Sequence, residues 1–315
     1  MTDSASSVRP STSSTRSTSS TSSTTSTTST TSAEDVMAGW FDARIVTGAH
    51  PASLLPPTDR DAIAAHLDRY ALSGALVSAM ASWLHHPIGG NAEASAVAHS
   101  LADRGVLACW TAIPATAGEL ESLTALVDRA LDQGVAAFRI HPLSHGFSPG
   151  LLNELYAALE TNRLPLCIDA AEISWADLST IATRHPELPI VVSNVGYRKL
   201  RELWAALDGH ANVFVDLVDF AAHQGVEWLA ANNLADRLLF ATGLGLRDPG
   251  EGVVRLAWSG LDDATVQLVG SGNASRLFGS GNASRPSGSE NADRTSGSEN
   301  ADRTSGVRRA DGGRS

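Results

Sequence analysis

Apolar and polar residues follow a regular alternation along the middle of the chain. Short, nearly continuous apolar runs are typical of strands covered on both faces, and segments with apolar residues every three or four positions are typical of helices. The eight apolar runs span 41–46, 72–80, 105–113, 135–140, 164–169, 188–194, 212–218 and 237–243. Helical spacing is clearest over 118–134 and 149–162, which lie between such runs. The pattern predicts eight strand–helix units.

Residues that favour helix ends support this alternation. Ser148-Pro149 and Ser174 stand where helices are expected to begin, and Gly105 and Gly134 stand just after expected helix ends. Eight such units predict an α/β fold, a (β/α)8 TIM-like barrel, with a doubly wound open sheet as the alternative. Because no G-x-G-x-x-G follows the first run, no dinucleotide cofactor is expected.

The two ends of the chain differ from the middle. Residues 1–35 are rich in Ser and Thr, and residues 280–315 continue a nine-residue repeat of small and polar residues that begins at Gly270. Neither stretch has enough apolar side chains to offset the entropy of an ordered chain. We therefore expect a barrel over 36–279 between a disordered Ser/Thr-rich tail and a disordered nonapeptide-repeat tail.

Charge and cysteine content narrow the classes of partner. The formal net charge of −11 argues against a nucleic-acid binder, which would need a basic face for phosphates. The sequence shows neither a secretory signal nor an apolar run of membrane-spanning length, so no membrane partner is expected. Cys109 and Cys167 lie in apolar runs and are expected to be buried reduced thiols. These features predict a cytoplasmic protein.

A barrel of this type would collect its functional side chains where the strands end and the following loops begin. Imidazoles, carboxylates and amides gather at those places, as acid–base chemistry requires. The residues singled out are Arg44, His85, His86, His141, Asp169, Asn194, Asp216 and Thr242. His86-Pro87 and His141-Pro142 are ordinary turn pairs, and for any one of these residues a hydrogen-bonding role in a loop is commoner than a chemical one.

Several strand ends together resemble the amidohydrolase superfamily, in its amidohydrolase-related (amidohydrolase 2) branch. Similar segments stand in the order and spacing of that family and cover roughly residues 40 to 279. They are "GVAAFRIHP", "LPLCIDA", "HPELPIVVSNVGY", "ANVFVDLVDF", "ADRLLFATGLGLRDPG" and "GSGNASRLFG". The resemblance implies a metal-dependent hydrolase fold with its site at the carboxyl ends of the strands.

The resemblance also implies a divalent metal, but its ligand positions are substituted here. Arg44 and Val46 stand where the family has the two histidines of H-x-H, and Asp169 and Asn194 replace histidines of later strands. Gly243 stands where the family has its catalytic aspartate. Val46 offers no lone pair, and the permanent charge of Arg44 would repel a cation. We therefore expect neither a metal nor another cofactor.

Two functions remain open from the sequence. The first is a hydrolase or lyase that acts without the usual metal on a small, carboxylate-bearing molecule. In that case Asp169 or Asp216 would be the general base, with His141, His85 or His86 as the acid. The predicted substrate-binding residues are Arg44, as a carboxylate anchor, with His85, His86, Asn194 and Thr242. The second is a non-catalytic barrel, a pseudoenzyme that binds a small molecule or a partner protein. The oligomeric state also remains open, a homo-oligomer included.

Overall fold

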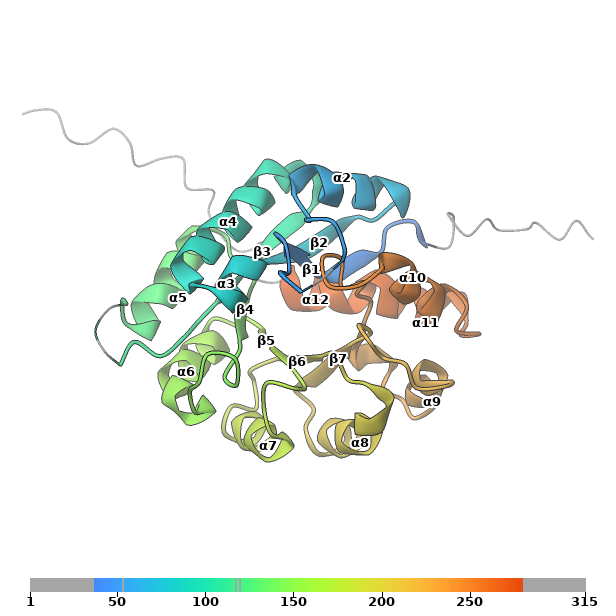
Figure 1. Cartoon of the computed structure of the whole chain (residues 1–315). Coiled ribbons are helices and arrows are strands. Elements are labelled where there is room, and N and C mark those ends of the chain that lie inside the picture. The colour runs from blue at the N-terminus through green and yellow to red at the C-terminus, as the bar shows by residue number, and fades with distance from the viewer. Residues whose placement is uncertain (1–36, 53, 117, 119, 280–315) are drawn as a thin grey trace, which may run out of the picture.

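The computed structural model describes residues 37–52, 54–116, 118 and 120–279, which form a ring of strands surrounded by helices (Figure 1). Both predicted tails, and so the tail boundaries at 35 and 280, lie outside the described residues. The strands are β1 (Phe41–Thr47), β2 (Gly74–Ala79), β3 (Val106–Thr111), β4 (Ala137–Ile140), β5 (Leu166–Asp169), β6 (Ile190–Ser193), β7 (Val213–Asp216) and β8 (Leu238–Leu239). Each strand falls inside one of the apolar runs or overlaps it.

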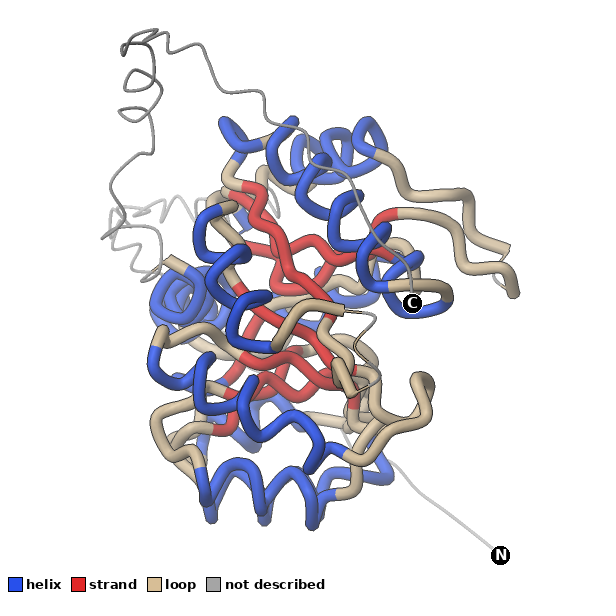
Figure 2. The backbone as a smooth tube through the Cα atoms, turned by 90° about the vertical axis from the view of Figure 1, so that its left-hand side faces the viewer, coloured by secondary structure: helices blue, strands red, loops and turns tan. Residues whose placement is uncertain are grey.

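The helices cover the outside of this ring of strands (Figure 2). The longer ones are α2 (Arg60–Arg69), α4 (Pro87–Ser100), α5 (Leu123–Asp132), α6 (Asn153–Thr161), α7 (Trp175–Arg184), α8 (Leu200–Gly209), α9 (Gly225–Ala231) and α10 (Pro249–Ala257). The shorter ones are α3 (Met80–Leu84), α11 (Asp263–Gln267) and α12 (Asn273–Phe278). Among the described residues, no helix is long and apolar enough to cross a membrane.

Local sequence explains where these helices begin. In α5, Leu123, Val127 and Ala130 recur at helical spacing and are buried against the strands. Ser122 precedes the helix and its Oγ accepts a hydrogen bond from the backbone N–H of Ala125 at 3.2 Å. Because this cap fixes the start, α5 begins at Leu123 and not at residue 118, where the predicted helical segment starts.

The strands form a closed barrel. They are ordered β1 to β8, and each is parallel to the next. The ring closes where the chain after β8 bonds to β1: Ala43 N donates to Phe240 O at 2.9 Å, and Val46 N donates to Leu244 O at 2.9 Å. The predicted (β/α)8 barrel is confirmed, and the doubly wound open sheet is wrong because an open sheet would leave these two edges apart.

Side chains that alternate along each strand build two separate apolar cores. Outward-facing residues such as Phe138 and Ile168 pack against helix residues such as Val127. Inward-facing residues such as Ala137 and Cys167 fill the centre of the barrel. Cys109 and Cys167 are both buried free cysteines, as expected. Because the inward face fills with small and apolar side chains, any charged residue that points inward must find partners above that layer.

Helix α12 closes the barrel at the amino-terminal ends of its strands. Leu277 and Phe278 are buried in the same inner core as Phe41, and the rings of Phe41 and Phe278 stack with centroids 5.9 Å apart. Asn273 donates from Nδ2 to the carbonyls of Ala235 and Leu238, each at 2.8 Å. With that end covered, the inner side chains can reach solvent only at the carboxyl ends of the strands.

Candidate active site

Four neighbouring strands carry a polar side chain into the barrel two residues beyond an apolar inner residue. The pairs are Ala137 and Arg139 on β4, Cys167 and Asp169 on β5, Val191 and Ser193 on β6, and Phe214 and Asp216 on β7. Since side chains two positions apart share one face of a strand, the polar member of each pair lies one layer above the apolar core. The alternation alone therefore gathers these polar groups at the carboxyl ends of the strands.

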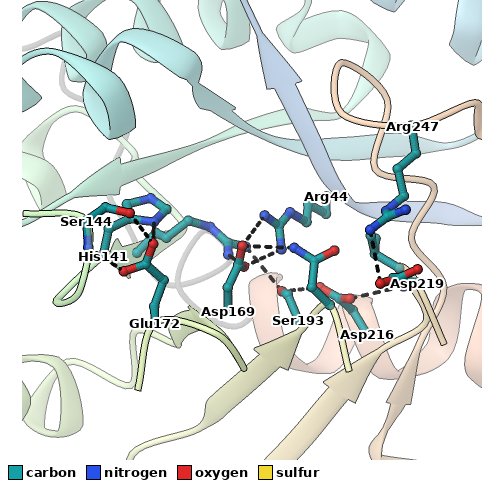
Figure 3. A network of polar contacts seen from close by, with 12 residues as sticks. Arg44, His141, Ser144, Asp169, Glu172, Ser193, Asp216, Asp219 and Arg247 are labelled. Carbon is teal, nitrogen blue, oxygen red and sulfur yellow. Dashed lines mark hydrogen bonds and ion pairs between the residues drawn. The ribbon is translucent and has the colours of Figure 1, made fainter. Parts of the chain in front are cut away.

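Asp169 is the centre of a buried ion cluster (Figure 3). From β1, Arg44 donates from Nη1 to Oδ1 at 2.5 Å and from Nη2 to Oδ2 at 2.9 Å. Arg139 Nη1 donates to Oδ1 at 2.8 Å, and Asn194 Nδ2 donates to Oδ2 at 2.9 Å. Arg44, Arg139 and Asp169 are each at most 4% exposed. The cluster joins β1, β4 and β5 across the interior of the barrel.

The two guanidinium groups determine the ionisation of Asp169. Burial alone would raise the pKa of this carboxyl, but the charges of Arg44 and Arg139 and the hydrogen bond from Arg44 hold it well below its usual range. Asp169 is therefore ionised throughout the physiological range. It balances one of the two permanent positive charges and leaves the other to be balanced by a different group.

Asp216 lies next to this cluster, and its pKa is shifted in the direction opposite to that of Asp169. Its Oδ2 accepts a hydrogen bond from Ser193 Oγ, and its Oδ1 accepts one from Val218 N at 3.1 Å. Burial, reinforced by the charge of Asp169, raises the pKa of Asp216 to about 6, although Arg44 and the Ser193 hydroxyl act against the rise. A carboxyl with this pKa exchanges a proton near neutral pH, as a general acid or base must.

His141 forms the side of the site nearest β4. Its ring stacks on that of Trp83 with centroids 5.3 Å apart and planes 13° apart. Its Nδ1 lies 3.9 Å from Oε1 of Glu172. The other oxygen of Glu172, Oε2, accepts a hydrogen bond from the backbone N–H of Ser144 at 2.9 Å. Burial and the positive charge of Arg139 lower the pKa of His141 well below its usual value, so the imidazole is neutral.

Several buried polar atoms of the site have no hydrogen-bond partner. They are Arg44 Nε, Arg139 Nε, His141 Nδ1 and Asn194 Oδ1. Buried polar groups are ordinarily hydrogen-bonded, so a cluster of unpartnered donors and acceptors indicates a place for water or a polar ligand. Asn194 also has a left-handed backbone (φ 55°), which is uncommon outside glycine and is found often at functional sites.

The structure brings together only some of the residues expected from the sequence. Arg44, Asp169, Asn194 and Asp216 lie in or beside the cluster, with His141 at its edge (Figure 3). The remaining predicted residues lie elsewhere, namely His85, His86 and Thr242. His85 and His86 are exposed; His86 caps α4 by accepting from Ile88 N at 3.3 Å. Thr242 bonds to Asp42 at 2.5 Å, outside the arginine cluster. Their roles in ligand binding stay predictions.

Sequence reasoning missed two members of the cluster, Arg139 and Ser193. A signal for Arg139 existed, because it stands two positions before His141, at the end of the run 135–140, and residues two apart share one face of a strand. Ser193 gave no such signal, since a serine at the end of an apolar run is equally typical of a turn. Its importance follows from its place between Asp216 and Arg139 Nη2, which lies 3.5 Å away.

Comparisons with known proteins agree with this architecture. The sequence model of the amidohydrolase family matches residues 41–280 of this chain. The chain therefore belongs to the amidohydrolase family. No curated protein matches the sequence. An uncharacterised TIM-barrel protein from Bordetella bronchiseptica is 16% identical with a TM-score of 0.59, and the match covers 77% of this chain and 99% of that one.

Two solved decarboxylases have a similar fold. The 2,6-dihydroxybenzoate decarboxylase from Rhizobium is 15% identical, with a TM-score of 0.58 and coverage of 77% of this chain and 99% of that one. The 5-carboxyvanillate decarboxylase from Novosphingobium aromaticivorans, solved with bound manganese, is 12% identical with a TM-score of 0.60. That match covers 78% of this chain and 98% of the decarboxylase. At such identities the likeness shows the fold.

The residues at the centre of this barrel do not fit a divalent metal of that kind. Both oxygens of Asp169 already accept hydrogen bonds from guanidinium groups, and a dication would meet the fixed charges of Arg44 and Arg139. Among the described residues, no group of three or more His, Cys, Asp or Glu could hold a metal ion. In this chain the arginines provide the positive charge at the centre of the site.

Proposed function

We propose that the protein is a lyase of the decarboxylase type, acting on a small carboxylic acid by acid–base chemistry with arginine in place of a divalent metal. Membership of the amidohydrolase family and the similarity to carboxylate decarboxylases support this reaction class. The non-catalytic alternative gains no support from these comparisons. Hydrolysis of a related substrate is the second candidate, because Asp216 could act as a base toward water above its pKa of about 6.

The observation that carries the proposal is the charge of the ion cluster. Two permanent cations, Arg44 and Arg139, face one ionised carboxylate, Asp169. While Asp216 keeps its proton, a carboxylate ligand would supply the second negative charge and could accept hydrogen bonds from the unpartnered Nε atoms. The planar guanidinium group suits carboxylate recognition because its donors match the geometry of the two oxygens.

Asp216 would supply the proton in this reaction. In a decarboxylation the bond between the substrate carbon and its carboxylate breaks, carbon dioxide leaves, and the electron pair stays on the carbon, which then takes up a proton. Asp169 cannot provide that proton because its ion pairs keep it ionised. A bound carboxylate would add negative charge near Asp216 and favour its protonated form, so substrate and acid would be ready together.

A ligand-binding experiment tests the anchor. Wild type, Arg44→Ala, Arg44→Lys and the exposed control Arg60→Ala would be compared by thermal shift with small carboxylates, including 2,6-dihydroxybenzoate, and with lactones. We expect carboxylates to stabilise wild type and Arg60→Ala, and to lose most of that effect in both Arg44 variants, because lysine lacks the planar fork of donors. The anchor must be abandoned if no carboxylate stabilises wild type more than Arg44→Ala.

A second measurement tests the acid. Carbon dioxide release from the carboxylates that bind would be followed in wild type and in Asp216→Asn, which keeps the shape of the protonated carboxyl but cannot give up a proton. We expect the variant to bind its ligand and to release no carbon dioxide. Equal turnover by the two proteins would remove Asp216 from the reaction.

A further inference from the structure

Strand β1 contains an irregularity at the residues that enter the site. Its pairing with β2 shifts register between Asp42 and Ile45. Ala43 belongs to the inner core, Arg44 also points inward to Asp169, and Ile45 packs outward against the helices. Regular alternation would place Ala43 and Arg44 on opposite faces of the strand. The bulge therefore turns the Arg44 side chain into the barrel.

Asp42 supports this bulge with both of its carboxylate oxygens. Oδ1 accepts from the backbone N–H of Arg44 at 3.1 Å and from that of Thr242 at 3.0 Å. Oδ2 accepts from Thr242 Oγ1 at 2.5 Å, and His66 Nε2 lies 3.0 Å from it and donates, since a carboxylate can only accept. Asp42 is fully buried. Four hydrogen bonds thus join β1, α2 and the chain after β8.

The backbone donors explain why a carboxylate is needed here. At a bulge, ladder hydrogen bonding is locally interrupted and backbone N–H groups need other acceptors. Asp42 Oδ1 accepts from the N–H groups of Arg44 and Thr242, on the two sides of the seam that closes the barrel. Gly243 N donates to Arg44 O at 3.1 Å, so Arg44 is held at both its N–H and its carbonyl.

We propose that Asp42 is a positioning residue for Arg44: by accepting from the backbone N–H of Arg44 at the β1 bulge and from that of Thr242 across the seam, it fixes the direction in which Arg44 enters the site. Asp42 does not touch Asp169 or a ligand held there. Its effect on ligand affinity rests on the proposed function, whereas its effect on the placement of Arg44 does not.

Three variants separate positioning from general stability. Asp42→Ala removes both carboxylate oxygens that accept hydrogen bonds at the bulge. Asp42→Asn keeps Oδ1 for the two backbone donors, and Thr242 Oγ1 and His66 Nε2 can each accept from the new amide after a hydroxyl rotation or a change of tautomer. Leu67→Ala deletes a fully buried side chain of α2 and destabilises the barrel without touching Asp42 or Arg44.

Two readouts are measured on each variant. The first is modification of Arg44 by an arginine-specific dicarbonyl, mapped by peptide mass, with exposed Arg60 as the internal reference. The second is the dissociation constant for 2,6-dihydroxybenzoate. We expect Asp42→Ala to make Arg44 reactive and to weaken binding by about tenfold or more. In Asp42→Asn and Leu67→Ala we expect Arg44 to stay protected, with affinity within about threefold of wild type.

The outcomes distinguish the two proposals. If Arg44 is equally protected in Asp42→Ala and Leu67→Ala, Asp42 does not position it. If wild type binds no carboxylate but Arg44 becomes reactive only in Asp42→Ala, the proposed function fails and the positioning role stands. Should Asp42→Ala not fold, hydrogen exchange in wild type decides. Protection of the Arg44 and Thr242 amides comparable to that of Val46 supports the role, and exchange as fast as in exposed loops overturns it.

Discussion

Asp169 at the end of β5 and Asp216 at the end of β7 have the same side chain, but their pKa values are shifted in opposite directions. Asp169 faces two guanidinium groups and stays ionised, while Asp216 is buried beside it and holds its proton up to a pH of about 6. A pair of carboxyls whose environments separate their pKa values is an arrangement that assigns different roles to the two groups. Here it assigns charge balance to Asp169 and proton transfer to Asp216.

The raised pKa of Asp216 has a consequence for stability. The folded pKa of about 6 lies above the ordinary value of 3.8, so the folded protein binds this proton more tightly than the unfolded chain. That stabilisation is complete below pH 3.8 and is lost as the pH rises to about 6. Urea unfolding from pH 4.5 to 7.5 should show the free energy of unfolding of wild type falling relative to Asp216→Asn as the pH rises through about 6, and levelling off above it. A difference independent of pH would contradict this prediction.

Asp169→Asn tests the ion cluster itself. The substitution leaves Arg44 and Arg139 buried without their carboxylate, and breaking a buried pair in this way typically costs about 3–5 kcal/mol. We expect a loss of that size in the free energy of unfolding, measured by urea denaturation. Asp68→Asn, which removes the partner of Arg104 on the exposed face of α2, is the control and should change little. Equal effects of the two substitutions would show that the cluster contributes no more than a surface pair.

Sequence reasoning reached part of this residue-scale picture. Arg44 and Asp169 were both singled out because they stand at strand ends that meet at one end of a barrel, and the structure brings them into contact. The bidentate geometry and the separation of the carboxyl pKa values could not be predicted, since they depend on burial and on distances between strands. His85 and His86 are a different case. Both were singled out as strand-end residues, yet they lie in the turn before α4, where the backbone needs a helix cap.

At the scale of elements, hydrophobic spacing predicted the strands well because the strands of a barrel are buried on both faces. The boundaries were less predictable. Strand β8 keeps regular pairing only over Leu238–Leu239, although the apolar run extends to residue 243. The rest of that run bonds to β1 across the seam, through contacts such as the hydrogen bond from Ala43 N to Phe240 O. A departure of this kind depends on a partner strand almost two hundred residues away, which local pattern cannot reveal.

Helix α4 contains two adjacent glycines that should respond oppositely to one substitution. A Cβ on Gly90 would lie 2.2 Å from the backbone nitrogen of Ser82, whereas one on Gly89 would meet nothing within 4 Å. Gly90→Ala should therefore push α4 away from α3 and lower the melting temperature. Gly89→Ala should leave it unchanged or raise it, because alanine favours a helix by up to about 1 kcal/mol over glycine. Thermal unfolding of both variants checks this, and equal shifts would contradict it.

At the scale of the whole molecule, the first copy of the nine-residue repeat differs from the later ones because it supplies buried side chains to the core of the barrel. It contains α12, whose Leu277 and Phe278 seal the inner core of the barrel. The later copies replace this apolar pair with Pro-Ser or Thr-Ser and offer nothing comparable to bury. If the folded region ends near residue 279, it includes only the first copy of the repeat. We therefore predict that the barrel requires the first copy and none of the later ones.

Truncation tests that prediction. A chain ending at residue 279 should unfold at the temperature of the full chain, because only polar repeats are removed. A chain ending at residue 272 loses Phe278 and the hydrogen bonds of Asn273, and removal of one buried aromatic side chain alone typically costs about 3–5 kcal/mol. Thermal unfolding of both chains decides. A large loss on ending at residue 279 would show that the boundary lies further on.

The salt bridge from Arg44 to Asp169 links β1 to β5, strands on opposite sides of an eight-stranded ring and 125 residues apart in sequence. Such a cross-link requires both halves of the chain to have met, and we therefore expect it to form late in folding. Contacts absent from the transition state govern how fast a protein unfolds and leave its folding rate almost unchanged. Stopped-flow measurements on Arg44→Gln should show faster unfolding with refolding near the wild-type rate. In that case the pair that gives this site its charge also sets the lifetime of the folded barrel.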